Sequence, residues 1–318
     1  MSIKIENTQV FGWEAAIRGA RNPMNSWLKS DSKFHIGTFV TDDQITEVRF
    51  EDVRSEIVEV DLKDVPYSGY IGALIGPADH KLLMNLCKGG TEEAKWRRMI
   101  HVQMDVTAPL YWWKEFETYK VGTVSNSCST MHKIHAKEFT LEDFSCEHLF
   151  REPEDSPNFV EAFLKDMEEW SIRGQEMGPN NYDENANPMP DSIDEREIAW
   201  HEANGAYETG ENWDDDGNRW VEADYAIDVL YATIRALNAY RSKFLETKDK
   251  RYWWQMIQLL PTSYNQKRTI DLNYEVLASQ YRQRKEHKLD EWRAYCEWIK
   301  TLPYSEFITM EERNEPTQ

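Results

Sequence analysis

The residues best suited to chemistry lie close together in segment 108–133. Its second half, VGTVSNSCSTMHK, gathers small hydroxyl and amide side chains directly after a helix-like stretch that ends at Lys120. Hydroxyl groups and the backbone N–H groups beside Gly122 can donate hydrogen bonds to phosphate oxygens, while Lys120 and Lys133 supply positive charge. We therefore interpret this segment as one wall of a nucleotide-binding site. A polar surface loop that caps a helix is the alternative interpretation of the same composition.

A strand and a helix are expected to position this wall. From Ile100 to Val106, apolar and polar residues alternate, which is the clearest strand pattern in the chain. Pro109 stands where a helix can begin, because the first helical turn does not need the N–H group that proline lacks. A helix is therefore expected over 110–120. Its aromatic residues cover more than one face, so they are expected in the core, except that Tyr119 is kept as a site residue.

The remaining periodicities predict a protein of helices and strands, in the α/β (α+β) class. A helix is expected over 10–20, followed by the polar loop RNPMNSWLKSDS, which lies close to Arg18 and Arg21 in sequence. One or two strands are expected within 34–60. Further helices are expected over 80–87, where two glycines end the pattern, and over 226–240, 252–259, 269–285 and 289–302.

Composition divides the chain into three parts. Residues 1–150 are expected to form the N-terminal part of a single catalytic-type domain, and residues 223–318 its C-terminal helical part. Between them, residues 151–222 are dense in Pro, Asn, Asp and Glu. We interpret this stretch as an acidic, partly mobile insertion.

Charge and hydropathy exclude several classes of partner. The formal net charge of −20 disfavours binding of a long nucleic acid, although a local basic cleft can still hold one nucleotide. No apolar stretch approaches the roughly 20 residues needed to cross a bilayer, and the N-terminus lacks a secretory pattern. The four cysteines form no CxxC pair, as expected of reduced thiols. These features predict a cytoplasmic protein without a membrane partner.

Two patterns imitate metal sites. His132 and His135 precede a Cys-x-His pair at residue 146, but this spacing is not one of the common zinc patterns. Residues 212–217 imitate the start of a calcium-binding loop, yet Ala223 stands at the twelfth position, where that loop requires an acid. No metal ion is therefore expected.

The order of features around the candidate wall resembles the central segment of the flavin-dependent thymidylate synthases. In that family a strand leads into an aromatic helix that begins with Ala-Pro, and then into the motif RHR-x2-S-x-N-E-x-S-x-R. The stretch TAPLYWW matches the approach, and Lys120 keeps a positive charge at the third motif position. The other motif positions fall on Thr118, Tyr119, Thr123, Ser125, Asn126, Cys128 and Thr130.

The C-terminal third resembles the ending of the same family. A long helix closes with Ala239-Tyr240-Arg241, a short helix leads to Leu260-Pro261, and TIDLNYEVL follows. In the family this last stretch reads close to TVNLRSLLHF, whose arginine binds the substrate phosphate. Asn273 stands in the place of that arginine, with Arg268 nearby.

The resemblance implies a mixed sheet packed with helices and a methyltransferase of dTMP biosynthesis. It would be a homo-oligomer, expected to be a tetramer, that binds FAD and a dUMP-like nucleotide and uses NADPH and methylenetetrahydrofolate as co-substrates. The flavin delivers hydride and the folate supplies the carbon, so the side chains mainly orient the ligands and polarise the uracil ring. The alternative function is a non-catalytic nucleotide-binding or partner-binding protein on the same scaffold.

The same resemblance, together with the residue chemistry above, assigns roles to individual side chains. Arg97 and Arg98 lie where the family has a flavin-contacting loop, although an Arg-Arg pair at a solvated strand end is the alternative. The expected catalytic residues are Lys120, Asn126 and Asn273. The expected cofactor-binding residues are Arg97, Arg98, Tyr119, Lys120 and Asn126. The expected substrate-binding residues are Lys114, Glu115, Thr123, Ser127, Cys128, Ser129, Thr130 and Arg268.

Overall fold

The structure is a computed structural model that describes residues 3–66, 72–151 and 226–311. Contacts divide the chain into two compact units, one formed by residues 2–128 and 265–318 and the other by residues 129–264 with Met1. The predicted acidic insertion and the calcium-like stretch at 212–217 lie outside the described residues, apart from Arg151. The two units are described separately below.

The larger unit is organised around an antiparallel sheet with the strand order β1-β6-β8-β7. The strands are β1 (Lys4–Phe11), β6 (His101–Pro109), β7 (Val124–Ser127) and β8 (Asn265–Asn273). The register pairs Val102 with Leu272 and Val124 with Asp271. The strand predicted at 100–106 is confirmed, and it lies between β1 and β8.

The expected helix over 269–285 is wrong in its first part. Residues 265–273 form strand β8, and the helix α9 begins only at Tyr274 (Tyr274–Arg284). In β8, Ile270 and Leu272 alternate with more exposed neighbours, which is the two-residue period of a strand. Hydrogen bonding to strands on both sides fixes this conformation, because local sequence preference is a weak prior that long-range pairing overrides.

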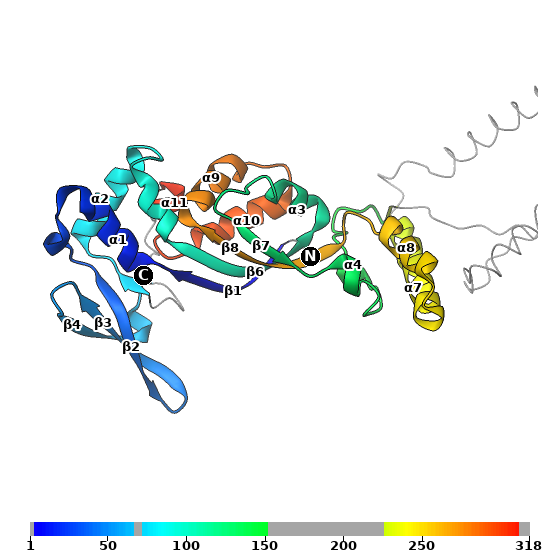
Figure 1. Cartoon of the computed structure of the whole chain (residues 1–318), viewed down its shortest axis with the longest axis horizontal. Helices are drawn as coiled ribbons and strands as arrows, with labels where there is room; N and C mark the ends of the chain where they lie inside the picture. The colour runs from blue at the N-terminus through cyan, green and yellow to red at the C-terminus, as the bar shows by residue number, and fades with distance from the viewer. Residues whose placement is uncertain (1–2, 67–71, 152–225, 312–318) are drawn as a thin grey trace, which may run out of the picture. The chain divides into compact units, whose positions relative to one another are not determined.

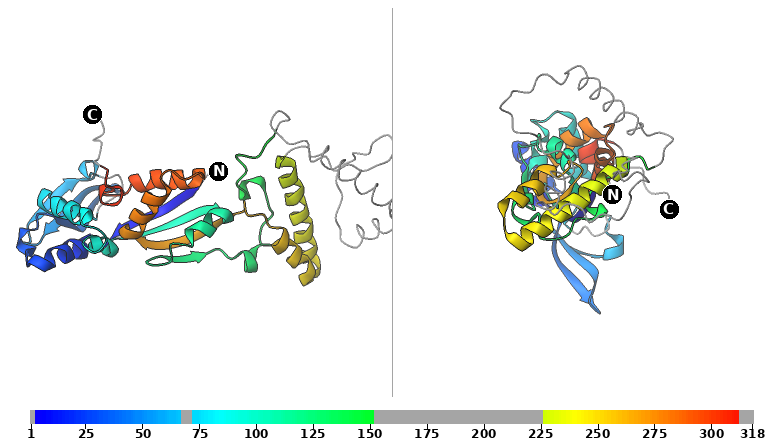
Figure 2. Two further views of the ribbon diagram at one scale, coloured as in Figure 1. Left: turned by 90° about the horizontal axis from the view of Figure 1, so that it is seen from above. Right: turned by 90° about the vertical axis from the view of Figure 1, so that its right-hand side faces the viewer.

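One face of this sheet carries the core of the larger unit. Along β6, Val102, Met104 and Val106 are buried, while the residues between them are more exposed. The helices α3 (Leu110–Phe116), α9 and α10 (Asp290–Lys300) cover the buried face, as Figures 1 and 2 show from two directions. Helix α3 begins directly after Pro109 as predicted but ends at Phe116, four residues earlier than expected.

The N-terminal half of the larger unit adds a second antiparallel sheet with the order β4-β3-β2-β5. Helix α1 (Trp13–Arg21) starts after Gly12, whose φ of 97° favours glycine, so the predicted helix over 10–20 begins three residues later than expected. The expected region of strands within 34–60 contains β2 (Lys33–Thr41), β3 (Gln44–Asp52) and β4 (Ile57–Asp61). The remaining elements are η1 (Asn22–Met24), η2 (Trp27–Lys29), η3 (Leu62–Asp64), β5 (Ala73–Leu74), α2 (Pro77–Lys88), η4 (Ala94–Met99) and α11 (Glu306–Thr309).

The smaller unit is helical where it is described. Helix α7 (Ala226–Thr247) contacts α8 (Lys250–Leu259), and residues such as Leu237 and Met256 form its buried core. Two short elements precede them, α4 (Thr130–Lys133) and the 3-10 helix η5 (Leu141–Asp143). The helices predicted over 226–240 and 252–259 are therefore confirmed.

These elements confirm the expected combination of helices and strands. All strand pairs described are antiparallel. The expected mixture of parallel and antiparallel strands is therefore not observed in the described residues. Within the described ranges, no helix combines the length and hydropathy required to span a bilayer. The same part of the chain contains no group of three or more His, Cys, Asp or Glu side chains arranged to hold a metal ion.

Candidate functional site

The predicted wall at 108–133 divides into a buried half and an exposed half. Trp112, Trp113 and Phe116 of α3 are at most 2% exposed and belong to the core, as expected for aromatic residues on several helix faces. Lys114, on the same helix, is exposed. The aromatic residues therefore support the sheet and do not form a ligand platform.

Glu115 and Tyr119 join an internal polar network. The Glu115 carboxylate accepts hydrogen bonds from Arg284, at 3.0 Å, and from the Trp292 indole, at 2.8 Å. The Tyr119 hydroxyl accepts from the Arg284 guanidinium at 2.9 Å and donates to Gln283 at 3.0 Å. Glu115 thus attaches α3, and Tyr119 the segment after it, to the C-terminal helices.

The polar run after α3 is mostly exposed. Lys120 lies in the turn before β7, and Asn126, Ser127 and Cys128 lie in or directly after this strand, with their side chains exposed. Thr123 differs, because its buried hydroxyl oxygen has no hydrogen-bond partner among the described residues. Strand β7 pairs with β8, so the structure does bring the two segments that carry the family resemblance side by side.

Arg268 and Asn273 of β8 are engaged within the protein. The Arg268 guanidinium lies 4.3 Å from the centre of the Trp113 ring and forms an ion pair with Glu117 at 2.7 Å. The Asn273 side chain accepts hydrogen bonds from the backbone N–H groups of residues 275 and 276 and so caps α9. Gly122 packs against it, since a Cβ atom there would lie 2.9 Å from the Asn273 amide nitrogen.

Ser129 and Thr130 belong to the smaller unit. Ser129 caps the short helix α4 by accepting a hydrogen bond from the backbone N–H of His132, and Thr130 is the first residue of that helix. Thr130 is half-buried and Ser129 is exposed. The predicted substrate-binding residues are therefore divided between the two units.

Arg97 and Arg98 have different environments. Arg97 is 7% exposed, and its guanidinium forms an ion pair with Glu275 at 2.7 Å and donates to the Phe307 carbonyl at 3.0 Å. Arg98 is exposed. Arg97 is therefore buried and paired within the protein, whereas Arg98 is solvated.

A pocket of about 400 Å³ lies between α1 and the strands β2 and β3. We call it the Trp27 pocket. It combines aromatic and apolar side chains with two arginines, and no residue of 108–133 lines it. Its lining residues are Glu14, Ile17, Arg18, Arg21, Trp27, Ser30, Phe34, His35, Ile36, Glu51, Asp52 and Val53.

The loop between α1 and β2 fixes the position of Trp27. It forms two short 3-10 helices, η1 with Pro23 near its start and η2 with Trp27 as its first residue. Asn25 between them adopts φ 48° and ψ 38°, a left-handed conformation that asparagine tolerates better than most residues. The Trp27 indole donates to the Asn22 side chain at 2.7 Å. The ring is 43% exposed and therefore accessible to a ligand.

A buried ion pair supports the floor of the Trp27 pocket. The Arg21 guanidinium donates to Asp79 at 2.6 Å and to the Ser26 carbonyl at 3.2 Å. Asp79 is fully buried and Arg21 is 5% exposed. Burial alone would raise the pKa of Asp79, but hydrogen bonds from Ser30, Ser32 and Arg21 outweigh it and hold that pKa below its ordinary value.

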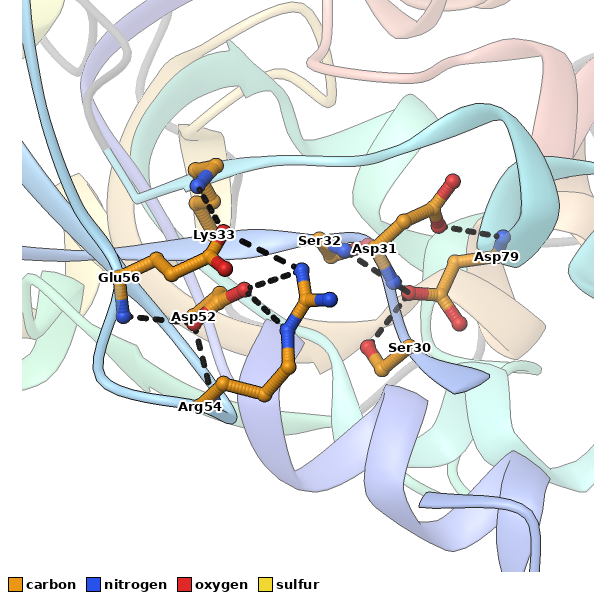
Figure 3. Close-up of polar contacts among 8 residues, drawn as sticks. All are labelled: Ser30, Asp31, Ser32, Lys33, Asp52, Arg54, Glu56 and Asp79. Atoms are coloured by element: carbon orange, nitrogen blue, oxygen red, sulfur yellow. Dashed lines mark hydrogen bonds and ion pairs between the residues drawn. The ribbon is translucent and has the colours of Figure 1, made fainter. Parts of the chain in front are cut away.

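The segment from Ser30 to Ser32 is attached to the start of α2, as Figure 3 shows. Both serine hydroxyls donate to Asp79 at 2.6 Å, and the Asp31 carboxylate accepts from the backbone N–H groups of Ala78 and Asp79. A carboxylate at this position satisfies N–H groups that the first helical turn leaves free. Gly76 is required by this close approach, because a Cβ atom there would lie 2.2 Å from the Asp31 side chain.

The opposite side of the pocket is held by Asp52 at the end of β3. Its carboxylate accepts from the backbone N–H groups of Arg54 and Glu56 and forms an ion pair with the Arg54 guanidinium at 2.9 Å (Figure 3). Burial opposes ionisation of Asp52, but the hydrogen bonds from Glu56 and Arg54 prevail and lower its pKa to about 2. Asp52 is therefore ionised at neutral pH and already compensated by protein groups.

The lining of the Trp27 pocket carries three acids, Glu14, Glu51 and Asp52, and two arginines, Arg18 and Arg21. Arg21 is paired with Asp79 and Asp52 with Arg54, so neither buried ion is available to a ligand. Among the described residues, Arg18 forms an ion pair with Glu14 alone, at 3.0 Å, and both side chains are more than 60% exposed. Arg18 is thus the pocket cation that a ligand can recruit most readily.

Sequence reasoning placed Arg18 and Arg21 close to the polar loop but did not predict this pocket. The available signal was the composition of the loop itself, where proline, asparagine and serine surround one tryptophan directly after an arginine-bearing helix. The sequence did not reveal that β2 and β3 contribute residues to the same pocket as α1 and this loop. Trp27, Phe34, His35 and Glu51 were therefore missed.

Comparisons with known proteins find solved structures of low similarity and no family. No family model and no curated sequence matches the chain. The flavin-dependent thymidylate synthase ThyX of Helicobacter pylori, in complex with FAD and dUMP, is 10% identical, with 98% of this chain and 99% of that chain covered and a TM-score of 0.46. The UMP/dUMP methylase PolB of Streptomyces cacaoi, bound with 5-Br UMP, is 12% identical, with 97% and 94% covered and a TM-score of 0.43. These values are too low to assign the chain to either protein's family.

Proposed function

We propose that this chain binds a pyrimidine mononucleotide of the dUMP type in the Trp27 pocket and acts on it as a flavin-dependent methyltransferase. The observation that carries the proposal is the combination of an accessible tryptophan, further rings and an exposed arginine around one pocket of about 400 Å³. This volume is in the lower part of the usual range for small-molecule sites, about 300–1,000 Å³. It suits a mononucleotide.

The base is assigned to the aromatic side of the pocket. Stacking of a base on an aromatic side chain contributes about 1–3 kcal/mol, and Trp27 is fixed by its hydrogen bond to Asn22 before a ligand arrives. Glu51, which is half-buried in the lining, can accept a hydrogen bond from the ring N–H of uracil. These contacts would select a planar ring with an N–H donor.

The phosphate is assigned to Arg18. An exposed ion pair such as Arg18 with Glu14 contributes only about 0–1 kcal/mol, so its loss costs little. A phosphate group offers the guanidinium a stronger, charge-assisted partner. Arg21 would position this wall and would not contact the nucleotide, because its pairing with Asp79 is buried.

The reaction in this proposal depends on FAD, which supplies the hydride when it is bound, with NADPH and methylenetetrahydrofolate as co-substrates. The Trp27 pocket can hold one ring system but not a nucleotide and a complete dinucleotide together, so FAD would need further surface. The family resemblance carried by β6, β7 and β8 supports this assignment, since these strands are neighbours in one sheet. Assembly as a homotetramer is part of the same proposal.

A second candidate is a nucleotide-binding protein without turnover on the same scaffold. It is favoured by Arg268, which was expected to bind the substrate, and Asn273, which was expected to be catalytic, because both are engaged by groups of the protein itself. This candidate requires the Trp27 pocket to bind its ligand but requires no flavin.

One set of measurements separates the two candidates. The purified full chain is incubated with FAD, the visible spectrum is recorded after removal of free flavin, and dTMP formation is then measured with dUMP, NADPH and methylenetetrahydrofolate. Retained flavin and turnover support the methyltransferase, whereas nucleotide binding without flavin or turnover supports the binding protein. A chain that retains no flavin and does not bind dUMP contradicts both.

A further inference from the structure

A second pocket, of about 260 Å³, lies in the larger unit at the C-terminal end of α2 and beside α9 and α11. We call it the Arg282 pocket. No residue lines both this pocket and the Trp27 pocket. Its lining residues are Cys87, Gly90, Thr91, Arg97, Ala278, Ser279, Tyr281, Arg282, Lys285, Ile308, Thr309 and Met310.

The lining of the Arg282 pocket is basic, although the chain as a whole carries a formal charge of −20. It contains Arg97, Arg282 and Lys285 and neither aspartate nor glutamate. Among the described residues, Glu275 pairs with Arg97 at 2.7 Å, and the Glu311 carboxylate lies 3.9 Å from the Lys285 amine and accepts a hydrogen bond from the Tyr281 hydroxyl. A local excess of positive charge against an acidic background is expected where an anion binds.

The three cations differ in burial and in their partners. Arg97 is held at the base by Glu275 and the Phe307 carbonyl, and its buried Nε has no hydrogen-bond acceptor among the described residues. Arg282 and Lys285 are exposed, and within the same ranges no acid lies within ion-pair distance of Arg282. Cations near the end of α9 also complement the helix dipole, but this effect does not account for Arg97, which comes from η4.

Hydroxyl groups complete the donor set. Thr91, Ser279 and Thr309 line the pocket with the cations. Gly90, at φ 95°, makes the turn beside them, and the space that its Cβ would occupy is open. Arginine forks and hydroxyl groups are suited to a phosphate, whose three terminal oxygens accept several hydrogen bonds at once. The pocket volume corresponds to roughly nine water molecules, which leaves room for atoms beyond the phosphate.

We propose that the Arg282 pocket binds a phosphate group, either free phosphate or the monoester of a small molecule, at a site separate from the Trp27 pocket. The binding is non-covalent. Burial raises the pKa of the Cys87 thiol to about 11, and the thiol donates a weak hydrogen bond to the Phe307 carbonyl. The proposal does not rest on the proposed function, because the two pockets share no residue.

The test is a calorimetric titration of the full chain with inorganic phosphate and, separately, with phenyl phosphate, at low and constant ionic strength. We compare the wild type with the double variant Arg282→Gln/Lys285→Gln. The matched control is Lys95→Gln/Arg98→Gln, which removes the same charge from exposed residues outside the lining. Circular dichroism and thermal unfolding check that all three proteins fold.

We expect the wild type to bind at least one of the two probes at a concentration below about 10 mM. The pocket variant should bind about tenfold more weakly or worse, whereas the control should change by less than about twofold. Tighter binding of phenyl phosphate than of phosphate identifies a monoester as the ligand class, and the reverse identifies free phosphate. No binding of either probe by the wild type, or equal losses in both double variants, overturns the proposal.

Discussion

The Arg21–Asp79 ion pair provides the sharpest test of how the Trp27 pocket is built. Asp79 accepts hydrogen bonds from Arg21, from the hydroxyl groups of Ser30 and Ser32, and from two backbone N–H groups. Asp79→Ala removes all of these acceptors and leaves the Arg21 charge almost fully buried without its partner. Removal of one partner from a buried pair costs about 3–5 kcal/mol.

This loss should be visible in both thermal and chemical unfolding. For a domain of this size, 1 kcal/mol corresponds to about 2–4 °C in Tm, so Asp79→Ala should lower Tm by roughly 6–20 °C. The control is Glu14→Ala, which breaks an ion pair of the same helix whose side chains are more than 60% exposed. It should change the unfolding free energy by less than about 1 kcal/mol.

A double-mutant cycle separates the ion pair from the rest of the network. Arg21→Met in the Asp79→Ala background removes the unpaired charge, so it should recover part of the lost stability or cost much less than Arg21→Met alone. Strictly additive effects of the two substitutions, or a loss below about 1 kcal/mol for Asp79→Ala, would refute the claim that this pair holds the pocket floor.

Three further predictions follow from the sheet and its helices. Glu115→Ala should reduce the unfolding free energy by about 1–3 kcal/mol, because the Arg284 and Trp292 donors lose their acceptor. The control Lys114→Ala, at an exposed residue, should change it by less than about 0.5 kcal/mol. Equal unfolding free energies of the two variants in urea titrations would contradict the role of Glu115 in this network. Gly122→Ala should destabilise the chain by about 1 kcal/mol or more, since φ is 78° and the new Cβ meets a side chain, whereas Gly37→Ala, with open space at its Cβ, should be close to neutral. Hydrogen bonds from a threonine, an asparagine and a lysine lower the pKa of Asp105 to about 2, so its stabilising contribution is complete above pH 4 and is lost as the pH falls from 4 toward 2. Thermal unfolding of Asp105→Asn should therefore vary less over this range than that of the wild type, and parallel pH profiles would be inconsistent with the assignment.

Local patterns predicted the elements whose own residues show a clear helical or strand period. The stripe Ile227, Leu230, Ile234 and Leu237 is the buried face of α7, and the alternation after residue 100 is strand β6. Strand β8 was missed because residues 269–273 join a helical pattern without an intervening glycine or proline. Its pairing with β6 and β7 depends on residues far away in the chain, which a local window does not contain.

The candidate site was also predicted only in those respects that depend on neighbouring residues in the sequence. Lys114, Lys120 and Asn126, which were expected to bind ligands, are exposed, but polarity does not state which side chains the protein itself engages. Arg268 and Asn273 carry groups that could bind a ligand, yet an ion pair and a helix cap occupy them. The loop around Trp27 lines a pocket because residues of β2 and β3 lie opposite it, and composition does not predict this arrangement.

The central claim, that the Trp27 pocket binds a dUMP-type nucleotide, is tested most directly by calorimetric titration of dUMP into the wild type, Trp27→Ala and Trp254→Ala. The two tryptophans are each 43% exposed, and Trp254 lies on α8 in the smaller unit, so it controls for loss of an exposed indole. The account predicts saturable binding to the wild type, binding weaker by about tenfold or more in Trp27→Ala, and unchanged binding in Trp254→Ala. Absence of binding to the wild type, or equal affinity of all three proteins, would contradict it.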